Sequence, residues 1–134
     1  MEVVQVGIYV KDVDETAKKL EKLLGIPFEI LEPDYKDLTY NGKPGKFRIR
    51  IGLANAGRVQ IELTQPTSGK TIFGKRRHGI HHLGIRTDDM EKSIEEMKRK
   101  GFKVIQSGHR PGTKWAYLDT EKETGIIFEL IERK

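Results

Sequence analysis

Apolar and polar residues alternate along several short stretches of the chain, a period of two that is typical of β-strands with one buried face. The first such stretch covers residues 4–10, and the apolar positions of residues 13–24 then recur at helical spacing instead. Asp12 stands just before this second stretch, Glu15 follows three residues later, and Gly25 lies just beyond it. These are common signals for the start and end of a helix. The pattern predicts a strand followed by a helix.

The same pattern returns in the second half of the chain. VQVGIYVKD (4–12) aligns with HHLGIRTDD (81–89) at a constant offset, so that Gly7 matches Gly84. The helical spacing of apolar residues after the first stretch is also repeated after the second. The chain is therefore predicted to contain two copies of one strand and helix unit.

Three strand-like runs follow each predicted helix, the second of which is expected from about residue 88 or 89 to Gly101. The runs are residues 27–31, 46–53 and 58–64 in the first half, and 103–107, 115–119 and 125–132 in the second. Each half therefore has the order βαβββ. Residues 32–45, which carry several turn-forming residues, are predicted to be a long loop.

The length of the chain and the repeat together define the expected domain organisation. A chain of 134 residues can bury one core but is short for two independent ones. We expect a single domain, 1–134, made of a first module at about 1–66, a connector at about 67–79 and a second module at about 80–134.

Alternation also predicts which polar side chains share a face. Gln5 and His82 lie on the face away from the helices in the two opening strands, whereas His81 lies on the helix-packed face. Glu62 has the same orientation in its strand. Glu129 falls between two isoleucines on its own face, so it needs a cation or a proton if that face is covered. The alternative is that this face is uncovered and that the strand lies at an exposed edge of the sheet.

Two further strands carry candidate ligand contacts. In residues 46–53 the apolar side chains are expected to face the helix, as in the other strands, which leaves Arg48 and Arg50 on the opposite face. Two neighbouring arginines can clamp a carboxylate or phosphate, although arginines on a solvated strand are at least as common. Trp115 and Tyr117 share one face, where they either wall a cleft or simply pack.

Composition narrows the function classes. The chain has no cysteine, which excludes disulfides, thiolate metal sites and cysteine nucleophiles. Its net charge of +5 comes from 25 basic and 20 acidic residues that are interspersed, which does not favour nucleic-acid binding. No apolar run is long enough to span a membrane, and the N-terminus has no features of a signal peptide, so we expect a cytoplasmic protein. Charged residues at 34%, mostly Lys and Glu, resemble thermophile composition.

The paired modules resemble a known superfamily. Opening strands of the form H-x-G-I-x-V-x-D and closing strands of the form I-E-L are similar to those of the vicinal oxygen chelate superfamily. This superfamily includes glyoxalases, methylmalonyl-CoA epimerases, extradiol dioxygenases and bleomycin-resistance proteins. VQVGIYVKDV, VQIELTQP, GIHHLGIRTDD, GHRPGTK and GIIFELIE resemble the epimerase and glyoxalase branch most. The resemblance implies an α+β fold, in which two βαβββ modules form a curved eight-stranded mixed sheet around a metal-binding cleft, and a homodimer.

The resemblance also implies a set of metal ligands. By position these are Gln5, Glu62, His82 and Glu129, the residues that alternation had already placed away from the helices. The superfamily usually has histidine where this chain has Gln5. An amide oxygen binds zinc or nickel less well than imidazole does, so among Co, Mn, Zn, Ni and Mg the site should favour Mn, Co or Mg. A metal-free protein is the alternative. A single histidine argues against dioxygenase chemistry.

The function implied by the resemblance is proton abstraction next to a carbonyl, as in a metal-dependent epimerase or isomerase similar to methylmalonyl-CoA epimerase. Glu129 and Glu62 would be the catalytic carboxylates. Candidate substrate contacts are Arg48, Arg50, Arg110, Lys114 and Trp115, for a small molecule with an acyl-CoA as one candidate. Epimerases of this kind carry a further carboxylate where this chain has Arg48 and Arg50. A glyoxalase-type lyase and a metal-free sequestering protein of the bleomycin-resistance type are the alternatives.

Overall fold

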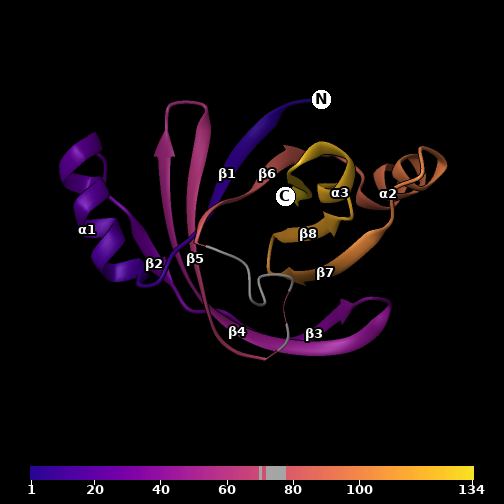
Figure 1. Cartoon of the computed structure of the whole chain (residues 1–134), viewed down its shortest axis with the longest axis horizontal. Helices are drawn as coiled ribbons and strands as arrows, with labels where there is room; N and C mark the ends of the chain where they lie inside the picture. Colours follow the sequence, from indigo (N-terminus) through magenta and orange to yellow (C-terminus); the bar gives the residue numbers. More distant parts are fainter. Residues whose placement is uncertain (70, 72–77) are drawn as a thin grey trace.

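The computed structural model describes residues 1–69, 71 and 78–134 of the chain. The first half contains β1 (Val3–Tyr9), α1 (Val13–Leu24), β2 (Glu29–Leu31), β3 (Asp34–Tyr40), β4 (Lys43–Ala56) and β5 (Val59–Gly69). The second half contains β6 (Gly79–Arg86), α2 (Met90–Arg99), β7 (Val104–Arg110), β8 (Thr113–Leu118), α3 (Glu121–Thr124) and β9 (Ile127–Arg133). Figure 1 shows α1 and α2 at opposite ends of a strongly curved sheet.

The strands form one mixed sheet that closes on itself. Its order is β2-β4-β3-β7-β8-β9-β6-β1-β5, and an additional β4–β5 pairing joins the two ends. Within each module the opening strand runs parallel to the closing strand, β1 with β5 and β6 with β9. The two opening strands pair with each other in antiparallel fashion. The predicted α+β fold with a curved mixed sheet is confirmed, with the short β2 as a ninth strand that pairs with β4 beside β3.

The helices begin where the capping signals predict. The Asp12 side chain accepts a hydrogen bond of 3.1 Å from the Glu15 backbone, and Asp89 does the same for Lys92 at 3.0 Å, so each helix has a capped N-terminus. Each helix packs its apolar stripe on the outer face of its own module. The cluster under α1 contains Val10, Val13, Ala17 and Leu63, and the one under α2 contains Met90, Met97, Ala116, Leu118 and Leu130. The polar residues between them face the inside of the sheet.

The prediction of a loop at residues 32–45 is wrong. This segment forms β3 and its hairpin with β4, and the hairpin turn is Asn41-Gly42, with φ of 52° and 77°. Two positive φ values are what a type I′ hairpin turn requires, and Asn-Gly is the strongest short sequence signal for it. The predicted connector at about 67–79 is only partly described. Residues 67–69 extend β5, residue 79 begins β6, and residues 70 and 72–77 lie outside the described residues.

The predicted orientation of β4 is also wrong. Phe47, Ile49 and Ile51 face the inside of the curved sheet, together with Trp115 and other aromatic side chains, rather than the helix. Arg48 and Arg50 therefore point outward. The apolar pattern predicts the wrong face here because the inside of this sheet is itself largely apolar.

Among the described residues, no helix combines the length and apolar character that a membrane span requires.

Candidate active site

The antiparallel pairing of β1 with β6 brings the first two predicted ligands together. Gln5 lies opposite Gly84, and Gly7 lies opposite His82, with a bulge in β6 at His81. A Cβ atom on Gly7 would stand 2.0 Å from Cε1 of His82, and one on Gly84 would stand 2.8 Å from Cβ of Gln5. Each of the two repeated glycines therefore leaves room for the ligand of the other module.

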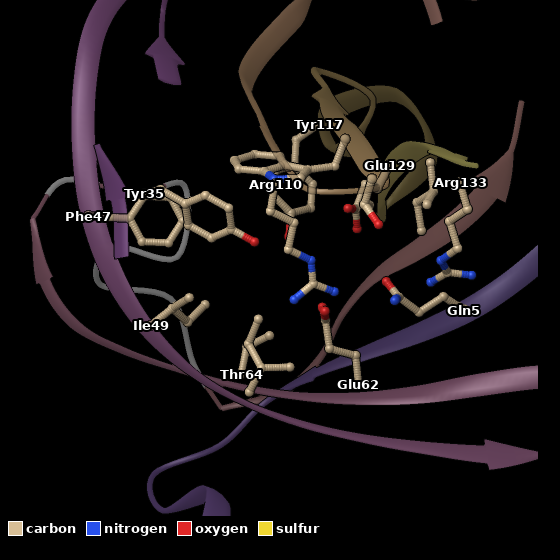
Figure 2. A pocket seen from close by; sticks show the side chains of 14 residues that line it. Gln5, Tyr35, Phe47, Ile49, Glu62, Thr64, Arg110, Tyr117, Glu129 and Arg133 are labelled. Atoms are coloured by element: carbon tan, nitrogen blue, oxygen red, sulfur yellow. The ribbon is translucent and has the colours of Figure 1, made fainter. Parts of the chain in front are cut away.

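The parallel partner strands supply the other two residues. β5 places Glu62 beside Gly7, and β9 places Glu129 beside Gly84. As a result, three oxygens surround Nε2 of His82: Oε2 of Glu129 at 2.9 Å, Oε1 of Gln5 at 3.1 Å and Oε1 of Glu62 at 3.4 Å. The structure thus brings all four predicted metal ligands to one point. Figure 2 shows the Gln5, Glu62 and Glu129 side chains converging in the cleft.

A polar network fixes the orientation of the Gln5 amide. Its Nε2 donates a hydrogen bond of 2.9 Å to Oε1 of Gln60, and Nη2 of Arg133 donates to the same oxygen at 2.7 Å. Because the amide nitrogen is held by Gln60, the amide oxygen faces His82. Outer contacts of this kind orient ligands in metal sites.

The charge state of His82 depends on its neighbours. Its side chain is fully buried, which by itself lowers the pKa, but the carboxylates of Glu129 and Glu62 outweigh burial and raise the pKa to about 9. Burial raises the pKa of Glu129, and the nearby His82 partly offsets this. On its other side, Nδ1 of His82 lies 2.8 Å from Nδ1 of His81. The His82 ring is therefore oriented with Nε2 toward the three oxygens.

The four residues fit a divalent cation. Oε2 of Glu129 is buried and has no aligned hydrogen-bond donor among the described residues, although His82 is close to it. The donor atoms of Glu62, His82 and Glu129 all lie within 4.8 Å of one another. Metal–ligand bonds of about 2.1 Å at right angles put neighbouring donor atoms about 3 Å apart. Three oxygens with one imidazole nitrogen suit oxygen-tolerant ions such as Mn²⁺, Co²⁺ or Mg²⁺.

The cleft around this centre has an apolar and aromatic wall. Its empty volume, including the open mouth, is about 460 Å³. The wall comes mainly from β3, β4 and β8 and contains Tyr35, Phe47, Ile49, Ile51, Trp115 and Tyr117. The Arg110 side chain extends into the cleft between this wall and Glu62 (Figure 2). A ligand in the cleft would therefore meet a guanidinium, two carboxylates and a largely apolar surface.

Comparison with known proteins shows the family to which this chain belongs. The model of the Glyoxalase/Bleomycin resistance protein/Dioxygenase superfamily matches residues 4–117, most of both modules. The chain belongs to this superfamily. No curated protein sequence matches the chain.

Several solved structures share the fold of this chain. Methylmalonyl-CoA epimerase from Mycobacterium tuberculosis has a TM-score of 0.75 at 21% identity, covering 98% of this chain and 87% of that chain. A hypothetical protein from Bacillus halodurans has a TM-score of 0.72 at 24% identity, covering 99% and 94%. A variant of Streptomyces coelicolor methylmalonyl-CoA epimerase in complex with 2-nitronate-propionyl-CoA has a TM-score of 0.68 at 20% identity, covering 99% and 94%.

The structure divides the predicted substrate contacts of this superfamily member into two groups. Arg110 and Trp115 line the cleft. Arg50 instead lies outside it and pairs with Asp14 at 2.8 Å and Glu32 at 3.2 Å. Two more predicted contacts also lie outside the cleft lining: Arg48 lies 3.4 Å from Asp34, and Lys114 lies 3.2 Å from Glu91.

The cleft also contains residues that the sequence patterns did not single out. Tyr35 lines it from β3, and the Asn41-Gly42 turn signal could have revealed that strand. Arg133 lines it from β9, where the alternation that places Glu129 and Ile131 on one face also includes Arg133. Both were missed because each lies at or beyond the edge of a predicted strand.

Proposed function

We propose that the protein is a metal-dependent isomerase or epimerase that removes a proton next to a carbonyl group, most like methylmalonyl-CoA epimerase. The observation that carries this proposal is the convergence of the Gln5, Glu62 and Glu129 oxygens on Nε2 of His82. These four residues would hold the cation. When bound, a divalent cation supplies Lewis-acid polarisation of a carbonyl oxygen and stabilises the negative charge that develops there.

Glu129 is the proposed general base. Its carboxyl is buried, and burial raises its pKa, which makes the carboxylate a stronger base than an exposed glutamate. Its Oε2 lines the cleft and lies 2.9 Å from Nε2 of His82, and no described residue donates an aligned hydrogen bond to it. Glu62 is the second proposed carboxylate. It is more exposed than Glu129, and its Oε1 lies 3.4 Å from His82 Nε2.

Arg110 is the proposed anchor for an anionic substrate group. No carboxylate of the described residues lies within ion-pair distance of its guanidinium, so it is available to bind a carboxylate or phosphate. Trp115 and the aromatic side chains beside it exclude water from the reacting carbon. Solved epimerases of the same fold, in complex with 2-nitronate-propionyl-CoA and with methylmalonyl-CoA, support an acyl-CoA as the substrate class.

The test is solvent exchange at the carbon next to the carbonyl. The protein is loaded with Mn²⁺ or Co²⁺ and incubated with one epimer of methylmalonyl-CoA in deuterated water. We expect deuterium at that carbon together with the opposite epimer, and we expect the E129Q variant to lose both activities. Glu91→Gln is the matched control, because Glu91 is exposed and pairs with Lys114 outside the cleft.

Other outcomes point to the other functions. Turnover of a hemithioacetal without exchange into the thioester would favour a glyoxalase-type lyase. Tight ligand binding with neither metal nor exchange would favour a sequestering protein. Either result would replace the epimerase proposal.

The homodimer stays a prediction, to be measured by light scattering. The resemblance to the superfamily implies it, and two separate half-sheets would leave unpaired edges that a dimer could cover. In the described residues the β4–β5 and β3–β7 pairings instead close the sheet within one chain. Of the described strands only the short β2 has a single neighbour, so strand pairing with a second chain would be limited to its outer edge.

A further inference from the structure

The two sides of the cleft differ in chemistry. Glu62 and Glu129 are the only carboxylates among the described residues that line it, and both approach the same atom, Nε2 of His82, at 3.4 and 2.9 Å. The facing wall, built by β3 and β4, contributes Tyr35, Phe47 and Ile49. Figure 2 shows these three side chains across the cleft from Glu129. We call this surface the far wall.

When the planar intermediate keeps one orientation in the cleft, inversion requires that the proton leaves one side of the carbon and that a proton arrives on the other side. A base that removes a proton and returns it from the same side exchanges the proton with solvent but keeps the configuration. Epimerisation therefore needs a proton donor near the far wall. Of the three far-wall residues, only Tyr35 has an ionisable proton, since Phe47 and Ile49 are hydrocarbons.

The Tyr35 side chain is held rigidly in this position. It is 8% exposed, and its ring packs at 5.2 Å against Phe47 and at 5.4 Å against Trp115, the second contact being edge-to-face. In Figure 2 its hydroxyl points into the cleft, toward Arg110 and the carboxylates. The ring contacts fix the ring plane, so the hydroxyl has a defined direction.

The surroundings of Tyr35 favour the protonated hydroxyl. Burial raises its pKa to about 12; the Arg110 charge opposes this, while the charges of Glu62 and Glu129 add to it. At neutral pH the group is therefore a phenol that can donate a proton, and Arg110 is the nearby cation that would stabilise the phenolate left behind.

We propose that Tyr35 is a catalytic acid that delivers a proton to the substrate carbon from the side opposite Glu129. This inference rests on the proposed function. Glu129 takes the proton and the electron pair of the broken C–H bond remains on the substrate as an enolate. The enolate carbon then forms a new C–H bond with the Tyr35 proton, leaving a phenolate. Glu129 loses its proton to water and the phenolate regains one from water, which restores both groups.

The test separates exchange from inversion. One epimer of methylmalonyl-CoA is incubated in deuterated water with the Mn²⁺-loaded Y35F variant. Deuterium in the recovered starting epimer reports removal and return of a proton on the Glu129 side, and formation of the other epimer reports delivery from the far wall. We expect inversion to fall by about a hundredfold or more, while exchange into the starting epimer stays within a few-fold of the unmodified protein.

The matched control is Tyr40→Phe. Tyr40 lies on the same strand, is partly buried against the same core cluster and does not line the cleft, so this substitution removes a hydroxyl without the proposed effect. The ratio of inversion to exchange should not change. Retained exchange in Y35F also shows that the variant is folded and holds its metal.

Three results would overturn the inference. If exchange and inversion fall in parallel in Y35F, Tyr35 only shapes the cleft. If inversion persists in Y35F, another group delivers the proton. Exchange without inversion in E62Q would then identify that group as Glu62. If the unmodified protein gives no exchange at all, the proposed function itself fails, a result that differs from the other two.

Discussion

The two modules follow the same path through the fold but contribute unequally to the cleft. In each, the opening strand supplies one ligand and the parallel closing strand supplies a carboxylate: Gln5 with Glu62, and His82 with Glu129. The second module has the only imidazole of the set and the more buried carboxylate. The first module has the short additional strand β2, and its β3 pairs with β7 of the second module.

This difference shows how a duplicated fold can divide its chemistry. Backbone pairing keeps the symmetry, since Gly7 and Gly84 each make room for the ligand of the other module. Side-chain identity breaks it. The second module supplies His82, whose pKa is raised, and the proposed base Glu129. The first module supplies the neutral amide of Gln5, the more exposed carboxylate of Glu62 and the far wall. Four predictions test this division.

The largest effect is expected at the two carboxylates. We expect Glu129→Gln to lower the rate of proton exchange by about 10²–10⁴-fold, the usual contribution of a general base. Glu62→Gln should cost less, because its amide oxygen can still serve as a ligand while Glu129 remains as base. Exchange rates measured at saturating metal give the comparison. Equal losses would show that the two modules share the base function.

The second prediction concerns pH and His82 in metal-free protein. The folded-state pKa of about 9 lies above the ordinary value of 6.5, so the stabilisation by the protonated ring is complete below about pH 6.5 and is lost as the pH rises through 9. The loss should be on the order of a few kcal/mol. Denaturant unfolding with a chelator at several pH values measures it. His82→Gln should flatten the profile, and an unchanged slope in that variant would point to another group.

The third prediction compares the two glycines. Gly7→Ala places a methyl group against the buried His82 ring, whereas Gly84→Ala meets the flexible end of the Ile131 side chain and the Cβ atom of Gln5. Overpacking of this kind costs about 1–3 kcal/mol, and we expect Gly7→Ala to cost more. Unfolding free energies and Mn²⁺ affinities measure both effects. A larger loss for Gly84→Ala would show that the Gln5 side is the rigid one.

The smallest effect is expected from substitution of the cations. Arg110→Gln should raise KM for an anionic substrate by about tenfold, in line with the loss of one charge-assisted hydrogen bond. Arg50→Gln is the matched control, since Arg50 pairs with Asp14 and Glu32 outside the cleft and should leave KM unchanged. A rise in KM for the Arg50 variant would place the substrate on the outer face of β4.

Local patterns in the sequence determined a large part of this protein. Helix starts follow from Asp12 and Asp89, because capping is a contact over three residues. Alternation combined with the repeat placed Gln5, Glu62, His82 and Glu129 away from the helices, and the resemblance to the superfamily implied that they meet at one point. The family model confirms the superfamily that the same motifs resemble.

Only the tertiary structure decided which side chains lie across the cleft from the four predicted ligands. Alternation gives two faces for each strand but does not say which one is buried against a helix and which against the other module. Arg48 and Arg50 were therefore placed on the wrong side, since the closed sheet has an apolar inside as well as an apolar outside under each helix. Tyr35 reaches the cleft because β3 also pairs with β7 of the second module, a contact between segments far apart in the chain that no local pattern encodes.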